Sequence, residues 1–197
     1  MNRKETTKFL TDVLITSRLS DRKYYAKEVS VDYGTNHTKR VDVLEFAPLG
    51  VIHASDIEKG SFICYEVKSC KEDIYSGNGL NFLGEKNYLV TNMETYKKIK
   101  MDIIEGKLQK YVQEHYPESS RKFGIMVAVP AHIDLRDADA IYKEMENPTP
   151  LDGEPSKWKM YVIERAYDSG RNRSTTELLF CMLRSKHSYS NHKQLVS

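Results

Sequence analysis

Residues 62–70, with the sequence FICYEVKSC, constrain the fold more than any other stretch of the chain. Five of the first six are apolar types that fill a buried strand, but Glu66 and Lys68 interrupt them two positions apart. Side chains of a strand alternate between its faces, so these two charges project from the same face. Burying an unpaired charge costs several kcal/mol. A charged pair in such a strand therefore indicates a function.

The other hydrophobic patterns predict a mixture of helices and strands. Apolar residues at spacings of three and four predict helices over residues 5–17, 94–115 and 174–185. Thr6 or Thr7 is the expected N-cap of the first helix. Gly106 weakens the second prediction, because glycine is a poor helix former. Alternating or continuous apolar runs predict strands over residues 24–34, 40–46, 61–69, 88–91, 123–130 and 158–166.

The order of these elements predicts an α/β or α+β fold, with a mixed central sheet flanked by helices. The length of 197 residues suits a single domain, residues 1–197, with enough chain to bury a core. Residues 131–157 carry many charges and three prolines. They predict a polar insertion with a short helix near residues 136–146, followed by a loop.

Composition limits the classes of function. The formal net charge of +2 does not by itself indicate a nucleic-acid-binding protein. The sequence has no apolar run of transmembrane length, and its first ten residues lack the apolar core of a signal peptide, so we expect a cytoplasmic protein and no membrane partner. The three cysteines form no C-x-x-C pair, which argues against a disulfide scaffold or a zinc finger.

Asp42 lies 24 residues before Glu66 on the preceding predicted strand. If strands 40–46 and 61–69 pair antiparallel, Asp42 lies across from Glu66 on the same face. Two carboxylates and the Lys68 ammonium would then meet near a strand end, a set that suits phosphodiester hydrolysis. Carboxylate oxygens bind Mg²⁺, and Mn²⁺ can replace it. The metal polarises a phosphoryl oxygen and activates bound water, and a lysine offsets the charge that develops on the phosphorane.

Asp42, Glu66 and Lys68 are therefore the candidate catalytic residues. The expected ligands of Mg²⁺ or Mn²⁺ are Asp42, Glu66 and the backbone carbonyl of Val67, which would point sideways from the strand. The alternative is a structural ion-pair network on a strand face, without any chemistry.

Asp42 followed by Glu66-Val67-Lys68 resembles the signature of the PD-(D/E)XK nuclease superfamily, whose members have the restriction-endonuclease-like fold. Val41 stands where that signature has proline. The segments KRVDVLEF, YEVKSCKEDI, EKNYLVTN, FGIMVAVP and RNRSTTELLFCMLRS follow one another as in its MmcB-like branch, over about two thirds of the chain. The resemblance implies a metal-dependent nuclease, with DNA as the expected substrate, in DNA repair or phage DNA metabolism.

The resemblance leaves two questions of function open. A nuclease fold that has lost its activity would only bind nucleic acid or a protein partner. A homodimer is also left open, because many members of the superfamily form pairs.

Several further residues are weaker candidates. Glu28, on the strand before Asp42, would add a carboxylate to the metal site, as upstream acidic residues do in this superfamily; its alternative is a surface charge. The loop at residues 76–82, SGNGLNF, is not followed by the G-K-[ST] of a P-loop and is either an ordinary turn or a cover over bound nucleic acid. The basic residues expected to contact nucleic acid, with solvated surface charge as their alternative, are Lys71, Lys86, Arg171 and Arg173.

Overall fold

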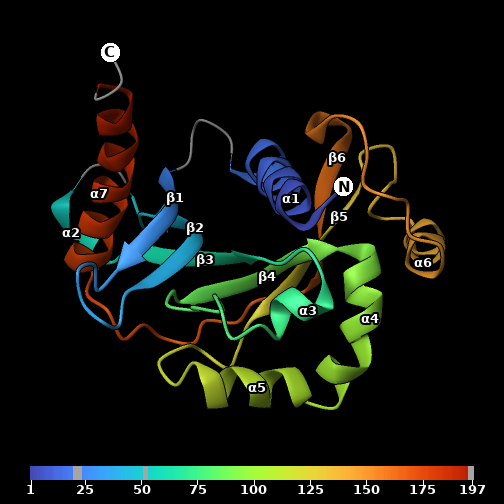
Figure 1. Ribbon diagram of the computed structural model, residues 1–197, viewed down its shortest axis with the longest axis horizontal. Helices are drawn as coiled ribbons and strands as arrows, with labels where there is room; N and C mark the ends of the chain where they lie inside the picture. The colour runs from blue at the N-terminus through green and yellow to red at the C-terminus, as the bar shows by residue number, and fades with distance from the viewer. Residues whose placement is uncertain (20–23, 51–52, 195–197) are drawn as a thin grey trace.

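A computed structural model describes residues 1–19, 24–50 and 53–194, with side chains up to Ser185. The helices are α1 (Arg3–Arg18), α2 (Ala54–Glu58), α3 (Lys71–Ile74), α4 (Met93–Ile104), α5 (Lys107–His115), α6 (Ala138–Glu146), the 3₁₀ helix η1 (Pro155–Lys157) and α7 (Thr175–Gln194) (Figure 1). The strands are β1 (Tyr24–Val31), β2 (Lys39–Ala47), β3 (Ser61–Val67), β4 (Lys86–Asn92), β5 (Gly124–Pro130) and β6 (Trp158–Glu164).

All six strands form one mixed sheet, in the order β1-β2-β3-β4-β5-β6. Strands β1, β2 and β3 are successively antiparallel, β3, β4 and β5 are parallel, and β6 runs antiparallel to β5. Parallel neighbours need a crossover connection. The chain crosses from β3 to β4 through α3, and from β4 to β5 through α4 and α5. The predicted fold class, a mixed sheet flanked by helices, is confirmed.

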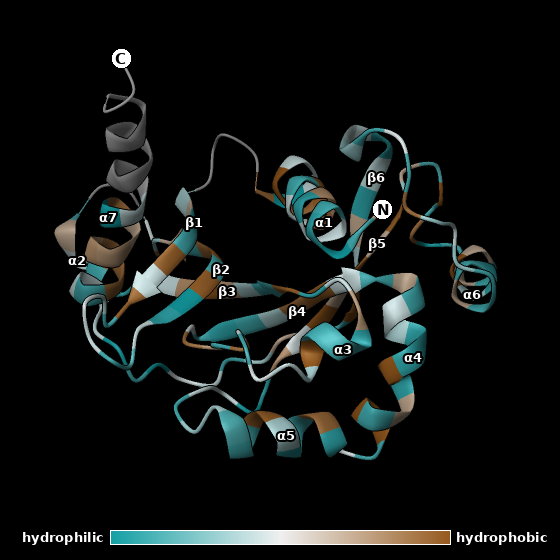
Figure 2. Ribbon diagram, viewed as in Figure 1, coloured by the Kyte–Doolittle hydropathy of each residue, from teal (hydrophilic) through white to brown (hydrophobic). Residues whose placement is uncertain are grey.

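Helices cover both faces of the sheet (Figure 1). On one face, the apolar side of α1 packs on Val43, Tyr65, Val67 and Val90. On the other face, α7 packs over β1–β3, and α4 and α5 pack over β4 and β5. Hydrophobic and hydrophilic residues alternate around α1 and α5, as expected of helices that cover a core on one side (Figure 2). Glu66 points to the face of α5 and α7, because it alternates with Tyr65 and Val67.

Two local predictions about the helices were wrong. The predicted helix 94–115 is two helices, because Gly106 has φ +71° and the chain turns there before α5 begins. The N-cap of α1 is Asn2, not Thr6 or Thr7, and it forms a capping box with Glu5. The short helices α2 and α3 were not predicted at all, since four or five residues give no periodic signal.

The predictions for the C-terminal half agree better with the structure. The insertion 131–157 contains the α-helix α6 within its predicted range and ends with the short 3₁₀ helix η1. Helix α7 begins at Thr175, close to the predicted start, but continues past residue 185 to Gln194. Ser174 Oγ accepts a hydrogen bond from the N–H of Glu177 at 3.1 Å. No helix in the described residues, 1–19, 24–50 and 53–194, is long and apolar enough to cross a membrane.

The break at Gly106 can be tested by the sign of a stability change. In a left-handed conformation alanine is strained, so Gly106→Ala should lower the free energy of unfolding by about 1–2 kcal/mol. Gly106→Asn should lower it less, because asparagine tolerates this region better. Urea unfolding of the three proteins measures the difference. If one helix ran through residue 106, Gly106→Ala would instead stabilise by about 1 kcal/mol.

Candidate metal and catalytic site

The pairing of β2 with β3 brings Asp42 beside Glu66. The register pairs Val43 with Tyr65, so the next antiparallel pair along the strands is Asp42 with Glu66. Asp42 Oδ2 accepts a hydrogen bond from the backbone N–H of Val67 at 2.8 Å. This bond holds the Asp42 carboxylate at the end of the β2–β3 ladder, next to Glu66.

Glu66 is fully buried, with 0% of its surface exposed. Its Oε1 accepts a hydrogen bond from the backbone N–H of Asn81 at 3.0 Å, whereas its Oε2 has no hydrogen-bond partner in the part of the chain that the structure describes. Burial and then the charge of Asp42 raise the pKa of Glu66 well above its ordinary value, against the opposing effects of Lys68 and the Asn81 N–H. An ionised Glu66 therefore has no hydrogen-bond donor at Oε2, although the charge of Lys68 acts on it.

Burial also raises the pKa of Asp42, against the opposing effects of the Val67 N–H and the Lys68 charge. Two neighbouring carboxyl groups repel each other when both are ionised. A divalent cation placed between them would favour the ionised form of both.

Lys68 is 5% exposed and directly follows β3, which ends at Val67. Its Nζ donates to the backbone carbonyl of Asn78 at 2.5 Å and lies 3.9 Å from Asp73 Oδ1. Asp73 in turn accepts hydrogen bonds from Arg3 and from the N–H and hydroxyl of Ser69. Although burial raises the pKa of Asp73, these bonds and the Lys68 charge lower it overall, so Asp73 stays ionised beside Lys68.

The loop between α3 and β4 covers Glu66 and Lys68. Asn78 and Asn81 bind the two side chains through backbone atoms. Gly79 has φ +64°, and a Cβ on this residue would lie 3.2 Å from Lys68 Nζ and 3.4 Å from Glu66 Oε2. The ammonium and the unpartnered carboxylate oxygen therefore face the same small space, which the absence of a side chain at Gly79 leaves open.

Glu28 lies in β1 at the register position opposite Asp42, between the pairs Lys27↔Val43 and Val29↔Val41. Its φ of +53° is unusual for a residue with a side chain. Its carboxylate is 2.8 Å from Arg40 Nε. Burial raises the pKa of Glu28, Arg40 opposes this effect, and the charge of Asp42 adds to it. Glu28 is thus a neighbour of Asp42, but it already has a cationic partner.

The donor set fits Mg²⁺. The described residues contain no group of three or more His, Cys, Asp or Glu that could hold a metal. Mg²⁺, however, usually keeps several waters and uses only one or two carboxylates. The N–H of Val67 points toward β2, and its carbonyl points to the same edge of the strand. Asp42, Glu66 Oε2 and the Val67 carbonyl therefore offer oxygen donors of the kind that Mg²⁺ prefers.

A groove of about 1140 Å³ runs past these residues. Asp42, Val67, Lys68 and Asp73 line it, together with Gly77, Asn78, Gly79, Asn81 and Tyr116. Seven of its lining side chains are Lys or Arg and four are Asp or Glu, so the groove attracts anions on balance. The basic side chains outside the catalytic set are Arg3, Lys4 and Lys8 from α1, with Lys27, Lys39 and Arg40 from β1 and β2.

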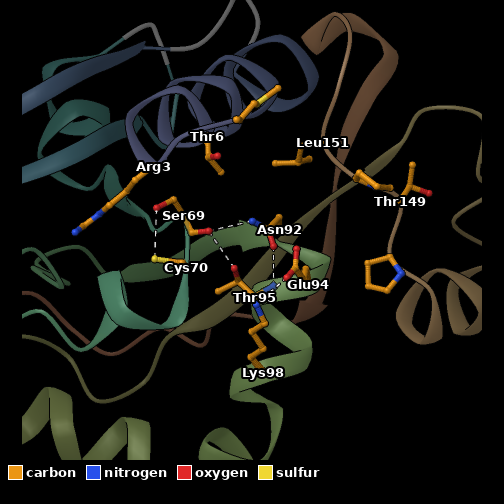
Figure 3. A pocket seen from close by; sticks show the side chains of 13 residues that line it. Arg3, Thr6, Ser69, Cys70, Asn92, Glu94, Thr95, Lys98, Thr149 and Leu151 are labelled. Atoms are coloured by element: carbon orange, nitrogen blue, oxygen red, sulfur yellow. Dashed lines mark hydrogen bonds and ion pairs between the residues drawn. The ribbon is translucent and has the colours of Figure 1, made fainter.

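Figure 3 shows a second cavity, of about 630 Å³, at the start of α4. Arg3 lines both the cavity and the groove. Within the cavity, the backbone carbonyl of Ser69 accepts hydrogen bonds from Asn92 Nδ2 and the Thr95 hydroxyl, each at 3.1 Å. Asp42, Glu66 and Lys68 do not line this cavity, which therefore lies beside the candidate site.

The structure does not bring the four predicted nucleic-acid contacts to the groove. Lys71 lies 2.8 Å from Asp102, and Lys86 begins β4 at the end of the sheet remote from Lys68. Arg171 pairs with Glu85 and stacks on Phe62, and Arg173 pairs with Asp32, Glu118 and Glu177. The two arginines thus have structural partners of their own.

Several residues of the site were missed by sequence reasoning. Arg3 and Asn81 reach the site from separate elements, and Asn81 contributes only a backbone N–H to Glu66, which any residue except proline could do. The basic residues of α1 carried a signal that could have been used. Lys4 and Lys8 are four residues apart, so they share one face of a helix.

No protein-family model, no curated protein and no solved structure matches the chain.

Asp42→Asn separates a metal site from an ion-pair network. Asparagine keeps an acceptor for the Val67 N–H and removes one of two repelling charges. In EDTA the variant should be as stable as wild type or more stable, by about 1 kcal/mol. A metal that binds only the folded state stabilises by about 2.7 kcal/mol at a hundredfold excess over Kd. Thermal melts with Mn²⁺ should show this gain for wild type and much less of it for the variant.

The alternative, a structural ion-pair network, predicts the opposite result for Asp42→Asn. A structural network needs Asp42 as a partner of Lys68. Destabilisation of Asp42→Asn in EDTA, together with a wild type indifferent to Mn²⁺, would contradict the metal site.

Proposed function

We propose that this protein is a metal-dependent nuclease that hydrolyses phosphodiester bonds, with DNA as the expected polymer. The observation that carries the proposal is the buried Glu66 beside Asp42, with an unpartnered Oε2 that faces the same space as the Lys68 ammonium. Two neighbouring buried carboxyl groups that share the single nearby ammonium of Lys68 keep an excess of negative charge when both are ionised, and a bound cation would offset it. The resemblance to the MmcB-like branch favours a role in DNA repair or phage DNA metabolism.

The residues have separate tasks in the proposed reaction. Asp42, Glu66 and the Val67 carbonyl would hold Mg²⁺, which when bound polarises the phosphoryl group and makes water a better nucleophile. As ligands of that metal, Asp42 and Glu66 would also orient the water that the metal activates. The water oxygen bonds to phosphorus and loses a proton to solvent, while the bond to the leaving sugar oxygen breaks and that oxygen takes up a proton. Lys68 offsets the negative charge that develops.

The groove supports a polyanionic substrate. Among the described residues, Lys4, Lys8 and Lys27 have no ion-pair partner, so their charges are available to phosphates. The groove contains few aromatic side chains for base stacking, namely Tyr116 and the imidazole of His37. Contacts to the phosphate backbone should therefore dominate, and binding should depend little on base sequence.

Lys68→Ala tests the catalytic assignment. The variant should lose cleavage by at least about a hundredfold, because a fixed positive group at the developing charge contributes effects of that size. Lys100→Ala, an exposed lysine of α4, is the matched control and should cleave like wild type. The assay incubates each protein with duplex DNA, single-stranded DNA and RNA in Mg²⁺ or Mn²⁺, and circular dichroism checks the fold.

The two rival interpretations give different results in the same assay. A module that binds without cleaving would show nucleic-acid binding and no cleavage by wild type. An ion-pair network would show a Lys68→Ala variant that is unfolded and a wild type that neither binds nor cleaves.

The groove lysines can be tested through the salt dependence of binding. The double substitution Lys4→Ala and Lys8→Ala should weaken binding uniformly across sequences. The substitution should also make the slope of log K against log salt shallower by about two. Binding releases about one counter-ion from the nucleic acid for each phosphate that a lysine neutralises, and the variant has two fewer such lysines. Fluorescence anisotropy in EDTA measures both quantities without cleavage. Lys97→Ala with Lys100→Ala is the matched control, and an equal loss of affinity in that pair would place the binding surface elsewhere.

A further inference from the structure

Arg3, at the start of α1, shares one carboxylate oxygen with the candidate catalytic lysine. Its Nη2 donates a hydrogen bond to Asp73 Oδ1, and Lys68 Nζ lies 3.9 Å from the same oxygen. The guanidinium and the ammonium are therefore neighbours, although one belongs to α1 and the other follows β3. Asp73 stays ionised, so the three groups together keep one positive charge in excess.

Asp73 holds the guanidinium of Arg3 in place. The side chain of Asp73 is 9% exposed, and its second oxygen, Oδ2, accepts hydrogen bonds from the N–H and the hydroxyl of Ser69, both at 3.2 Å. Because these bonds fix the carboxylate, the bond at Oδ1 restricts where the guanidinium can lie. A charged group that is already held in position loses little conformational freedom when it binds a ligand.

Most of the donors of Arg3 remain available. A guanidinium has five N–H donors. Nε and Nη1 of Arg3 have no hydrogen-bond or ion-pair partner among the described residues, and the side chain is 59% exposed. Arg3 lines the groove of the candidate site, and Figure 3 shows its side chain extending away from Asn92 and Thr95. A ligand in the groove can therefore reach the donors that Asp73 does not use.

Arg3 differs from the other cations at the start of α1. Lys4 and Lys8 also line the groove, but no acid among the described residues holds either side chain. Their flexible ammonium groups suit general attraction of phosphates. Arg3 is fixed beside Lys68, so its charge lies close to the place where the proposed reaction occurs.

We propose that Arg3 contacts the phosphate that is cleaved, while its Nη2 stays bonded to Asp73. This inference rests on the proposed nuclease function and adds a catalytic residue to it. A planar guanidinium has more than one pair of parallel N–H groups, so it can hold a carboxylate on one side and a phosphate on another. Arg3 and Lys68 then contact different oxygens of the same phosphate and together stabilise the negative charge that develops there.

The substitution Arg3→Lys separates this role from a structural one. Lysine keeps the charge and can still pair with Asp73, but it has no further planar set of N–H groups for the phosphate. The kcat of the variant should fall by about tenfold or more, with little change in KM, because the contact strengthens in the transition state. Arg136→Lys is the matched control. Arg136 pairs with Asp134 at 3.1 Å on the surface and does not line the groove, so this variant should cleave like wild type.

Chemical rescue gives a readout that a purely structural role would not change. Arg3→Ala removes the whole guanidinium and should lower kcat by about a hundredfold or more. Guanidinium ion, added far below the concentrations that unfold the protein, should restore part of the lost cleavage, because it can bind between Asp73 and the phosphate. Circular dichroism sets an assay temperature below the unfolding transition of every variant, so that kcat is compared among folded proteins.

The experiment measures kcat and KM for wild type and the three variants on one DNA duplex and its single strand, with Mg²⁺ or Mn²⁺. A lower kcat for both Arg3 variants, with rescue of Arg3→Ala by guanidinium ion, supports the proposal. If wild type cleaves and Arg3→Lys has the same kcat, or guanidinium ion restores nothing, the role of Arg3 is overturned while the nuclease function stands. A wild type that cleaves none of the substrates overturns the nuclease function and this role together.

Discussion

The burial of Glu66 beside Asp42 opposes folding, and several neighbouring groups reduce its cost in free energy. An uncompensated buried carboxylate costs several kcal/mol, a large part of the roughly 5–15 kcal/mol that typically stabilises a domain. The chain offsets some of this with two backbone N–H groups, from Val67 to Asp42 and from Asn81 to Glu66. Both bonds depend on precise placement of backbone. The β2–β3 register supplies the first, and the loop after α3 supplies the second.

The sheet and the central pair of acids could be predicted because each rests on a short-range pattern. Alternation in FICYEVKSC identifies the strand and the shared face of Glu66 and Lys68, and an antiparallel partner 24 residues earlier brings in Asp42. The helix break at Gly106 could not be predicted from a short-range pattern. A single glycine fits either a weak helix or a turn, and the choice depends on how Leu108 and Val112 pack beneath β4.

The rest of the site lacked such patterns. Asn81 acts through its backbone, Arg3 arrives from the first turn of α1, and Tyr116 arrives from the end of α5. These contacts depend on the tertiary arrangement of loops, which periodicity does not encode. Arg171 and Arg173 show the converse. Their charges suggested phosphate binding, but neighbouring acids that are distant in sequence pair with them.

The distribution of fixed charge suggests how metal and substrate depend on each other. The ammonium of Lys68 is directed to the Asn78 carbonyl and lies near Asp73, which Arg3 also contacts. The positive charges of Lys68 and Arg3 thus lie near Asp73, and Glu66 Oε2 has no hydrogen-bond donor among the described residues. In the proposed reaction, the cations of the groove would attract a polyanion, whereas Asp42 and Glu66 would repel the phosphate to be cleaved. A divalent cation at the two carboxylates would remove that repulsion, and a bound phosphate would in turn supply the cation with further oxygen ligands. Since coupling between two ligands is reciprocal, each should strengthen the binding of the other at this site.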